Sequence, residues 1–300
     1  MVAALVAAPD TLAAAYAHCT RLARSHYENF PVASLLLPAA MRPHIAAIYA
    51  FARRADDFAD EPGPDDTERL ARLDDWHRRL HHPGVTGHAP DDLIFVALEH
   101  TMRACGLPVG LFDDLLSAFV QDVGTHRYRT WDDVMDYCRR SANPVGRLVL
   151  RVAGYDVPRF DAASDAMCTA LQLANFWQDF GRDWRHGRLY VPLEEYDRQG
   201  AREADLDAGQ MTTAWRRTLA AAVGRTRRLF DAGRPVCDGV AGRLRWELRL
   251  TWLGGARILD RIEASGFDVL HHRPALGARD AGPLLWRAVV WTTDHTDHTD

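Results

Sequence analysis

The sequence predicts an all-α fold. Apolar residues recur every three or four positions through most of the 300 residues, and no comparable run alternates with the period of two typical of a half-buried strand. Residues that start and stop helices bound these runs. Pro43 lies near a predicted start, Gly106-Leu107-Pro108 marks a stop, and Thr130 precedes Trp131-Asp132-Asp133 as an N-cap followed by first-turn acids.

Ten segments carry the helical pattern. They span residues 12–27, 43–60, 66–80, 91–105, 111–123, 131–141, 145–153, 162–185, 214–231 and 239–265. Stretches 61–66 and 81–87 are rich in proline and glycine, and each has the length of an inter-helix loop rather than of a domain linker. We therefore expect one all-α domain over residues 1–300, with a disordered polar tail from about residue 292, although His295 and His298 among its aspartates could bind metal.

Composition narrows the class of protein. A chain with 47% hydrophobic and 26% charged residues can bury a large core, while a net charge of -5 gives no basic surface for nucleic acid. Five cysteines without a C-x-x-C pair indicate neither a disulfide framework nor a zinc site. No apolar run approaches a membrane span, and the N-terminus lacks a basic signal region. We expect a cytoplasmic protein that could associate peripherally with the inner face of the membrane if its substrate is hydrophobic.

The first group of polar residues with a chemical pattern lies in the segment 43–60. Tyr49, Arg53, Asp56 and Asp60 fall at spacings that place them on one stripe of a helix. A solvated salt-bridge face would show the same spacing. The rest of the segment, however, is apolar nearly all round, and charges on a largely buried helix need partners because unpaired buried charge is costly.

A second polar stripe lies in the segment 162–185. Gln172, Asn175, Asp179 and Asp183 share one helix face among apolar neighbours. Two facing helices of this kind would converge carboxylate oxygens on one cavity. Mg²⁺ is held by one or two carboxylates per ion and completes its coordination with water and substrate phosphate. The two stripes therefore predict a magnesium-dependent enzyme acting on a diphosphate.

Several motifs in order along the chain resemble one known family. They are His26-Tyr27-Glu28-Asn29-Phe30, Tyr49 to Asp57, Tyr137-Cys138, Val145-Gly146, the second aspartate segment followed by Gly187-Arg188-Leu189-Tyr190-Val191-Pro192, and Ile258-Leu259-Asp260-Arg261-Ile262. From about His26 to Arg273 the chain is similar to the squalene and phytoene synthase family. The resemblance implies an isoprenoid-synthase helical bundle with a central apolar cavity.

The resemblance also implies roles for individual residues. Two or three Mg²⁺ ions would be bound by Asp56, Asp60, Asp179 and Asp183. A prenyl diphosphate substrate would contact Tyr27, Phe30, Arg53, Gln172, Asn175, Arg188, Tyr190 and Arg273. The residues assigned to catalysis are Tyr49, Arg53, Tyr137, Asn175 and Gln178. Metal ions and arginines would neutralise the departing diphosphate, and aromatic faces would stabilise the resulting carbocation.

Departures from the family pattern favour one branch. Members that join two prenyl diphosphates usually carry Asn-Ile-Leu-Arg-Asp where this chain has Asn175-Phe176-Trp177-Gln178-Asp179, so neutral Gln178 replaces an arginine. Gly254-Gly255 stands where phytoene-forming members tend to have tyrosine, and Ser141 to Gly146 replaces the common Val-Ala-Gly-x-Val-Gly. These variants resemble the hydroxysqualene-forming members. They imply ionisation of presqualene diphosphate and capture of the cation by water, without NADPH, and no G-x-G-x-x-G dinucleotide motif stands out.

Two alternatives stay open from the sequence. The chain could join two prenyl diphosphates to give presqualene diphosphate or phytoene, which Gln178 and Gly255 disfavour without excluding. It could also be a catalytically silent assembly factor, although a scaffold has no use for four buried aspartates. Handover of the substrate from another enzyme is a further expectation about its partners.

Overall fold

The computed structural model describes residues 9–25, 36–61, 63–82, 84 and 87–291. These residues form fifteen helices and no strand, which confirms the predicted all-α class. The helices are α1 Pro9–Ser25, α2 Arg42–Asp60, α3 Asp66–His81, α4 Pro90–Cys105, α5 Gly110–Gly124, α6 Trp131–Ser141, α7 Asn143–Val152, α8 Pro158–Gln178, α9 Phe180–Arg185, α10 Leu193–Arg198, α11 Glu203–Asp207, α12 Thr213–Gly233, α13 Pro235–Gly239, α14 Gly242–Ala264 and α15 Ala278–Val289. The motif at Tyr27 and Phe30 and the tail from residue 292 lie outside the described residues.

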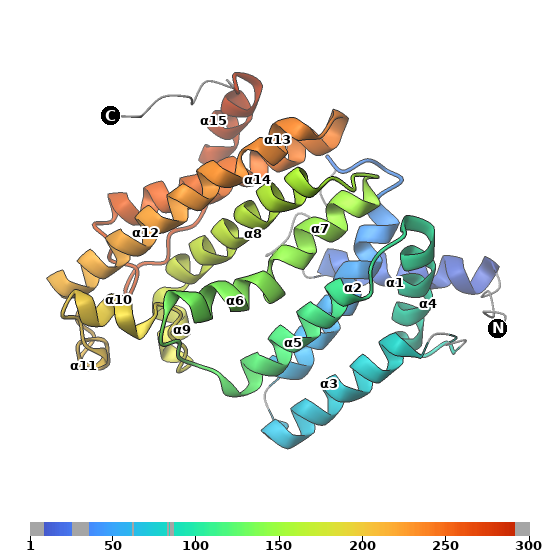
Figure 1. Cartoon of the computed structure of the whole chain (residues 1–300), viewed down its shortest axis with the longest axis horizontal. Coiled ribbons are helices and arrows are strands. Elements are labelled where there is room, and N and C mark those ends of the chain that lie inside the picture. The colour runs from blue at the N-terminus through green and yellow to red at the C-terminus, as the bar shows by residue number, and fades with distance from the viewer. Residues whose placement is uncertain (1–8, 26–35, 62, 83, 85–86, 292–300) are drawn as a thin grey trace.

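Two long helices organise the packing, and each carries one aspartate pair at or beside its C-terminal end. Helix α2 packs against α1, α3, α4 and α5, while α8 packs against α7, α12 and α14 (Figure 1). Helix α2 begins with a proline in its first turn and buries apolar side chains on several sides, as its apolar sequence predicts. Its Phe51 stacks on Trp76 of α3 with ring centroids 5.6 Å apart. Truncating Phe51 to alanine should cost about 3–5 kcal/mol.

The predicted capping signals are present in the structure. The backbone N–H of Asp133 donates to the Thr130 hydroxyl at 3.2 Å, and the N–H of Thr130 donates back to the Asp133 carboxylate at 2.9 Å. This capping box fixes the start of α6. Gly106 ends α4 in a left-handed conformation with φ of 63°, which glycine adopts without strain.

The predicted helix over residues 162–185 is wrong in one respect, because it breaks at Asp179 into α8 and α9. The cause lies in the segment that follows α14. The Gly181 N–H donates to the Val269 carbonyl at 3.2 Å, and a Cβ at position 181 would lie 2.2 Å from the Leu270 carbonyl oxygen. Only glycine permits this approach. The break therefore lets residues beyond α14 reach the second aspartate pair.

The sequence pattern missed four helices, α10, α11, α13 and α15. Three of them are five or six residues long, too short to show a helical period. Helix α15 contains Pro283, and a proline at that place in the sequence predicts the end of a helix rather than its interior. The five cysteines are free thiols, and burial raises the pKa of Cys19 to about 12.

Candidate active site

The first aspartate pair lies at the C-terminal end of α2. The Arg53 guanidinium contacts two acids of its own helix, with Nη1 3.2 Å from the Asp56 carboxylate and Nη2 2.7 Å from that of Asp57. Its Nε is buried without a hydrogen-bond partner among the described residues. Tyr49 lies one turn before Arg53 and is half-buried, and burial raises the pKa of its hydroxyl.

Asp56 and Asp60 repel each other in this arrangement. Burial, and next the negative charge of Asp60, raise the pKa of Asp56 to about 6, although Arg53 acts in the opposite direction. Of the two side chains, Asp56 is 38% exposed and Asp60 is 45% exposed. Arg53 and Arg188 thus do not supply enough positive charge to keep the pKa of Asp56 at its usual value.

The second aspartate pair spans the break between α8 and α9. Asp179 is the residue at the break, and the N–H of Asp183 donates to its carbonyl at 2.8 Å, so the one-turn spacing survives. Burial, and next the charge of Asp179, raise the pKa of Asp183 to about 7. Both pairs therefore share the same electrostatic character.

Arg188 is the residue that connects the two pairs. Gly187 ends the turn after α9 with φ of 77°, and the segment that follows is held to residues 126–128 by the Leu189 N–H, which donates to the His126 carbonyl at 3.0 Å. This places the Arg188 guanidinium 2.5 Å from the Asp60 carboxylate. Burial opposes its charge, but the ion pair with Asp60 raises the pKa of Arg188. The same positive charge offsets part of the rise in the pKa values of Asp56 and Asp183.

Arg273 reaches Asp179 from the segment between α14 and α15. Its Nε donates to the Asp179 carboxylate, and its Nη2 lies 3.3 Å from the second carboxylate oxygen. The Gln178 amide donates to the carbonyl of the next residue, Pro274, at 2.7 Å. Gln178 therefore holds the segment that carries Arg273. The N–H group that makes this contact already has a hydrogen-bond acceptor within the protein.

Aromatic side chains form a cluster beside these charges. Phe176 of α8 stacks on Tyr190 with ring centroids 3.7 Å apart and planes 3° from parallel. Tyr137 of α6 lies 6.2 Å from Tyr190, and Tyr128 lies 5.7 Å from Tyr137, measured between ring centroids. Tyr137 and Tyr190 were predicted, whereas Phe176 and Tyr128 were missed because a lone aromatic in an apolar helix or loop is indistinguishable from core packing.

Asp122, near the C-terminal end of α5, was also missed by sequence reasoning. Its carboxylate accepts a hydrogen bond from the Tyr137 hydroxyl at 2.9 Å. Burial raises the pKa of Asp122 to about 7; Tyr137 and Arg188 lower it, and Asp60 and Asp56 add to the rise. Asp122 thus belongs to the same electrostatic group. Asp122 has no acidic partner at i, i+4 along α5, so the spacing of acids in the sequence did not identify it.

The remaining predicted residues of α8 have fewer described contacts. Asn175 is exposed and lies one turn before Asp179, whose N–H donates to its carbonyl at 2.8 Å. Gln172 is half-buried. The predicted residues described here thus come from four segments: α2, α6, the α8–α9 region with the segment after it, and the chain before α15.

The donor set fits Mg²⁺ in its chemistry. Asp56, Asp60, Asp179 and Asp183 offer only hard carboxylate oxygens, which Mg²⁺ prefers over nitrogen or sulfur. The raised pKa values of Asp56 and Asp183 indicate that the site is short of positive charge.

Gly255, a position where the sequence departs from the family pattern, is required by packing. A Cβ there would lie 2.5 Å from the Phe230 ring and 2.7 Å from Leu171.

Comparison with known proteins places this arrangement in a family. The squalene/phytoene synthase family model matches residues 23–280. The chain belongs to the squalene/phytoene synthase family. Among family relatives, a hydroxysqualene synthase of Zymomonas mobilis is 40% identical over 68% of this chain and 67% of its own length. A 15-cis-phytoene synthase of Synechococcus elongatus is 31% identical over 88% of each chain.

Solved structures of the family share the fold. Squalene synthase HpnC from Alicyclobacillus acidocaldarius superposes with a TM-score of 0.79 at 42% identity, covering 87% of this chain and 97% of the other. A dehydrosqualene synthase superposes with a TM-score of 0.78 at 20% identity, which supports the shared isoprenoid-synthase fold alone. In the described part of this chain, no helix is both long and apolar enough to span a membrane.

Proposed function

We propose that this protein converts presqualene diphosphate and water to hydroxysqualene and free diphosphate, in a reaction that depends on Mg²⁺. The observation that carries the proposal is the similarity to two proteins named hydroxysqualene synthase, from Zymomonas mobilis and Rhodopseudomonas palustris, each 40% identical over about two thirds of this chain. Phytoene synthases are 30–31% identical over a larger share.

The arrangement of charges supports a diphosphate leaving group. Mg²⁺, when bound by the four aspartates, would act as a Lewis acid that neutralises charge on the diphosphate. Arg188 and Arg273 each pair with an aspartate in the structure and would turn toward phosphate oxygens. Arg53 would add a third cation from α2. The C–O bond to diphosphate breaks with its electron pair leaving on the phosphate oxygen.

The aromatic cluster supports a carbocation on the other side of that bond. Tyr137, Phe176 and Tyr190 pack on one another in the structure, and when the substrate is bound their π-systems would stabilise a positive charge and exclude water. The cation is then quenched when one water oxygen bonds to carbon and a proton is lost. The substrate is neither oxidised nor reduced overall in this reaction, so we propose that it needs no NADPH.

Gln178 favours the single-diphosphate substrate. Its contact with the Pro274 carbonyl places a neutral, engaged amide where enzymes joining two diphosphates usually carry arginine. We propose that Gln178 positions Arg273, and that the site has fewer phosphates to neutralise. Condensation of two prenyl diphosphates is the second candidate function, and the similarity to phytoene synthases favours it.

The experiment that separates the two candidates supplies each substrate in turn. Purified protein is incubated with Mg²⁺ and either presqualene diphosphate, farnesyl diphosphate or geranylgeranyl diphosphate, and the lipid products are identified by mass spectrometry. The proposal predicts hydroxysqualene from presqualene diphosphate only. Presqualene diphosphate formed from farnesyl diphosphate, or phytoene from geranylgeranyl diphosphate, would support condensation, and no product from any substrate would support a silent assembly factor.

We also propose a peripheral contact with a membrane surface, because the substrate is a long hydrocarbon. Helix α15 supports this with its exposed face. Leu285, Trp286 and Val289 are 54%, 66% and 61% exposed, and they lie on one side of the helix. Asp280 on α15 is buried and pairs with Arg261 of α14 at 2.7 Å, which fixes the helix on the bundle. An apolar face of this kind suits the boundary of a bilayer.

A further inference from the structure

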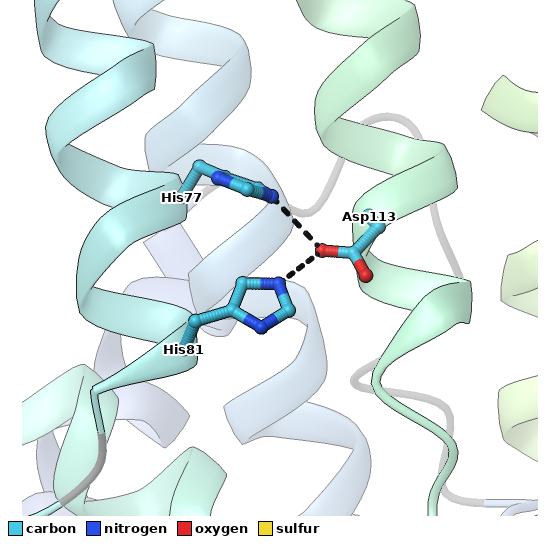
Figure 2. Close-up of side chains that lie close together, drawn as sticks. All are labelled: His77, His81 and Asp113. Atoms are coloured by element: carbon cyan, nitrogen blue, oxygen red, sulfur yellow. Dashed lines mark hydrogen bonds and ion pairs between the residues drawn. The ribbon is translucent and has the colours of Figure 1, made fainter.

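Two histidines and an aspartate meet between α3 and α5, apart from the residues of the candidate active site. His77 and His81 of α3 lie one helical turn apart and both point toward Asp113 of α5 (Figure 2). One carboxylate oxygen of Asp113 is 3.2 Å from His77 Nε2 and 2.7 Å from His81 Nε2. All three donor atoms lie within 4.8 Å of one another.

This geometry is close to that of a transition-metal site. Tetrahedral zinc with ligands at about 2.0–2.2 Å separates its donor atoms by roughly 3.3 Å. The His77 to Asp113 distance already matches, and a small rotation of the exposed His81 side chain would open the shorter one. Histidines at i, i+4 on a helix present two imidazoles on one face, which is the spacing that helical zinc sites use.

The competing interpretation is a pair of surface hydrogen bonds. Both imidazoles would then donate from Nε2 to one carboxylate oxygen, and exposed contacts of this type contribute little to stability. Two hydrogen bonds to the carboxylate account for the contacts of each ring with Asp113, whereas a shared metal ion also requires the two imidazole nitrogens to lie near each other, and these lie within 4.8 Å. Among the described histidines, cysteines, aspartates and glutamates, no other three residues bring their ligand atoms this close together.

We propose that His77, His81 and Asp113 form a binding site for one divalent transition-metal ion of the Zn²⁺ class, which crosslinks α3 to α5. Two imidazole nitrogens favour Zn²⁺ over Mg²⁺, which the oxygen-only aspartate pairs suit. Water would complete the coordination, because all three side chains are partly exposed. In catalytic H-E-x-x-H helices a glutamate follows the first histidine, but here that position is Arg78, so the site supplies no general base.

The site is distinct from the aspartate pairs. Asp113 precedes Asp122 by nine residues on α5, which corresponds to about 13 Å along the helix axis. Helices α3 and α5 both pack on α2, the helix of Asp56 and Asp60. The metal would therefore stabilise the packing of α3 and α5 around α2 without contacting the residues of the active site.

The test measures Zn²⁺ binding by untagged full-length protein in excess Mg²⁺, which occupies the oxygen-rich site. Wild type is compared with His77→Ala, His81→Ala and Asp113→Asn, with His82→Ala and Asp114→Asn as matched controls. His82 is the neighbouring exposed histidine, whose Nδ1 bonds the Arg78 carbonyl at 2.7 Å, and Asp114 is the neighbouring acid, which pairs with Arg139. Circular dichroism checks that every variant is folded.

We expect each histidine variant to bind one Zn²⁺ fewer per chain than wild type, and Asp113→Asn to bind that ion about tenfold or more weakly, since even outer ligand partners change affinity by that factor. Both controls should bind as wild type does. Co²⁺ should give a visible absorption band that His77→Ala loses. The proposal is overturned if His77→Ala and His81→Ala bind as many Zn²⁺ ions as wild type, with the same affinity.

Discussion

Arg188 supplies the positive charge that both aspartate pairs share. It bonds Asp60 directly and lowers the pKa of Asp56, Asp122 and Asp183 through space. A single guanidinium cannot neutralise several carboxylates, so burial still leaves three of them with raised pKa values. This shortage of positive charge supports the proposal that the aspartates bind Mg²⁺.

Replacing Asp56 or Asp179 with asparagine should lower turnover by about a hundredfold or more, because both are proposed Mg²⁺ ligands and even the partners of metal ligands change affinity or activity by about 10- to 100-fold. Stability should be kept in Asp56→Asn, since burial makes its charge unfavourable. Steady-state kinetics in Mg²⁺ and circular dichroism provide the measurement, with the exposed Asp207→Asn as control. Near-wild-type activity in either variant would remove that residue from the metal site.

Asp122→Asn should stabilise the protein in a pH-dependent way. The pKa of Asp122 is raised from 3.8 to about 7, so its ionisation favours the unfolded chain increasingly between these values and by a constant amount above them. The variant keeps an oxygen that accepts the Tyr137 hydrogen bond. Its gain in melting temperature over wild type, measured without Mg²⁺, should grow from pH 5 to pH 7 and then level off. A difference that shrinks as pH rises would contradict this.

At the residue scale, the sequence predicted the acids that come in pairs and the arginines that follow recognisable motifs. Helical spacing identifies a candidate site residue only when a second polar residue lies one turn away on the same helix. Asp122 has its partner, Tyr137, on another helix, and Phe176 and Tyr128 resemble ordinary core residues. Such contacts depend on how helices pack, which a single sequence does not show.

The break between α8 and α9 is the main feature of the site at the element scale. Gly181 makes no helical hydrogen bond to Trp177, because its N–H donates to the Val269 carbonyl, and its lack of a Cβ leaves room for the Leu270 carbonyl. The break admits the segment after α14, and Arg273 and Pro274 then contact Asp179 and Gln178. Helical periodicity predicted both α8 and α9, but it could not locate the break because the hydrogen bonds from Asp179 to Asn175 and from Asp183 to Asp179 continue across it.

Gln178→Ala should weaken diphosphate binding through Arg273, because the Pro274 carbonyl loses its donor. We expect KM to rise by severalfold, the loss of one hydrogen bond of about 1 kcal/mol, with little change in kcat. Gln178→Arg restores a donor and adds a charge, so it should tighten diphosphate binding and slow its release. Inhibition by inorganic diphosphate measures both variants. If both change the melting temperature but not diphosphate affinity, Gln178 is a packing residue only.

Helix α15 should carry any contact with a bilayer. Trp286→Ser removes the most exposed apolar side chain of the helix and should reduce binding to vesicles of anionic and zwitterionic lipids in a flotation assay. The matched control is Trp246→Ser on α14, where the tryptophan is 38% exposed. Equal vesicle binding by wild type and both variants would contradict a role for α15.

At the scale of the whole molecule, the buried apolar residues form two hydrophobic clusters. The first is built around α2 with its neighbours α1, α3, α4 and α5, and the second around α8, α12 and α14. Each cluster fixes one long helix and therefore one aspartate pair. Arg188 links the two pairs, because it forms an ion pair with Asp60 and its charge also acts on Asp183. The helical class, most helix bounds and the two pairs followed from the sequence, since they depend on local periodicity.

The most direct test of the proposed hydration is the origin of the oxygen in the product. Protein, Mg²⁺ and presqualene diphosphate are incubated in ¹⁸O-labelled water without NADPH, and the lipid product is analysed by mass spectrometry. Capture of the carbocation by water predicts hydroxysqualene that carries one ¹⁸O atom. An unlabelled product, or a product that forms only when NADPH is added, would contradict it.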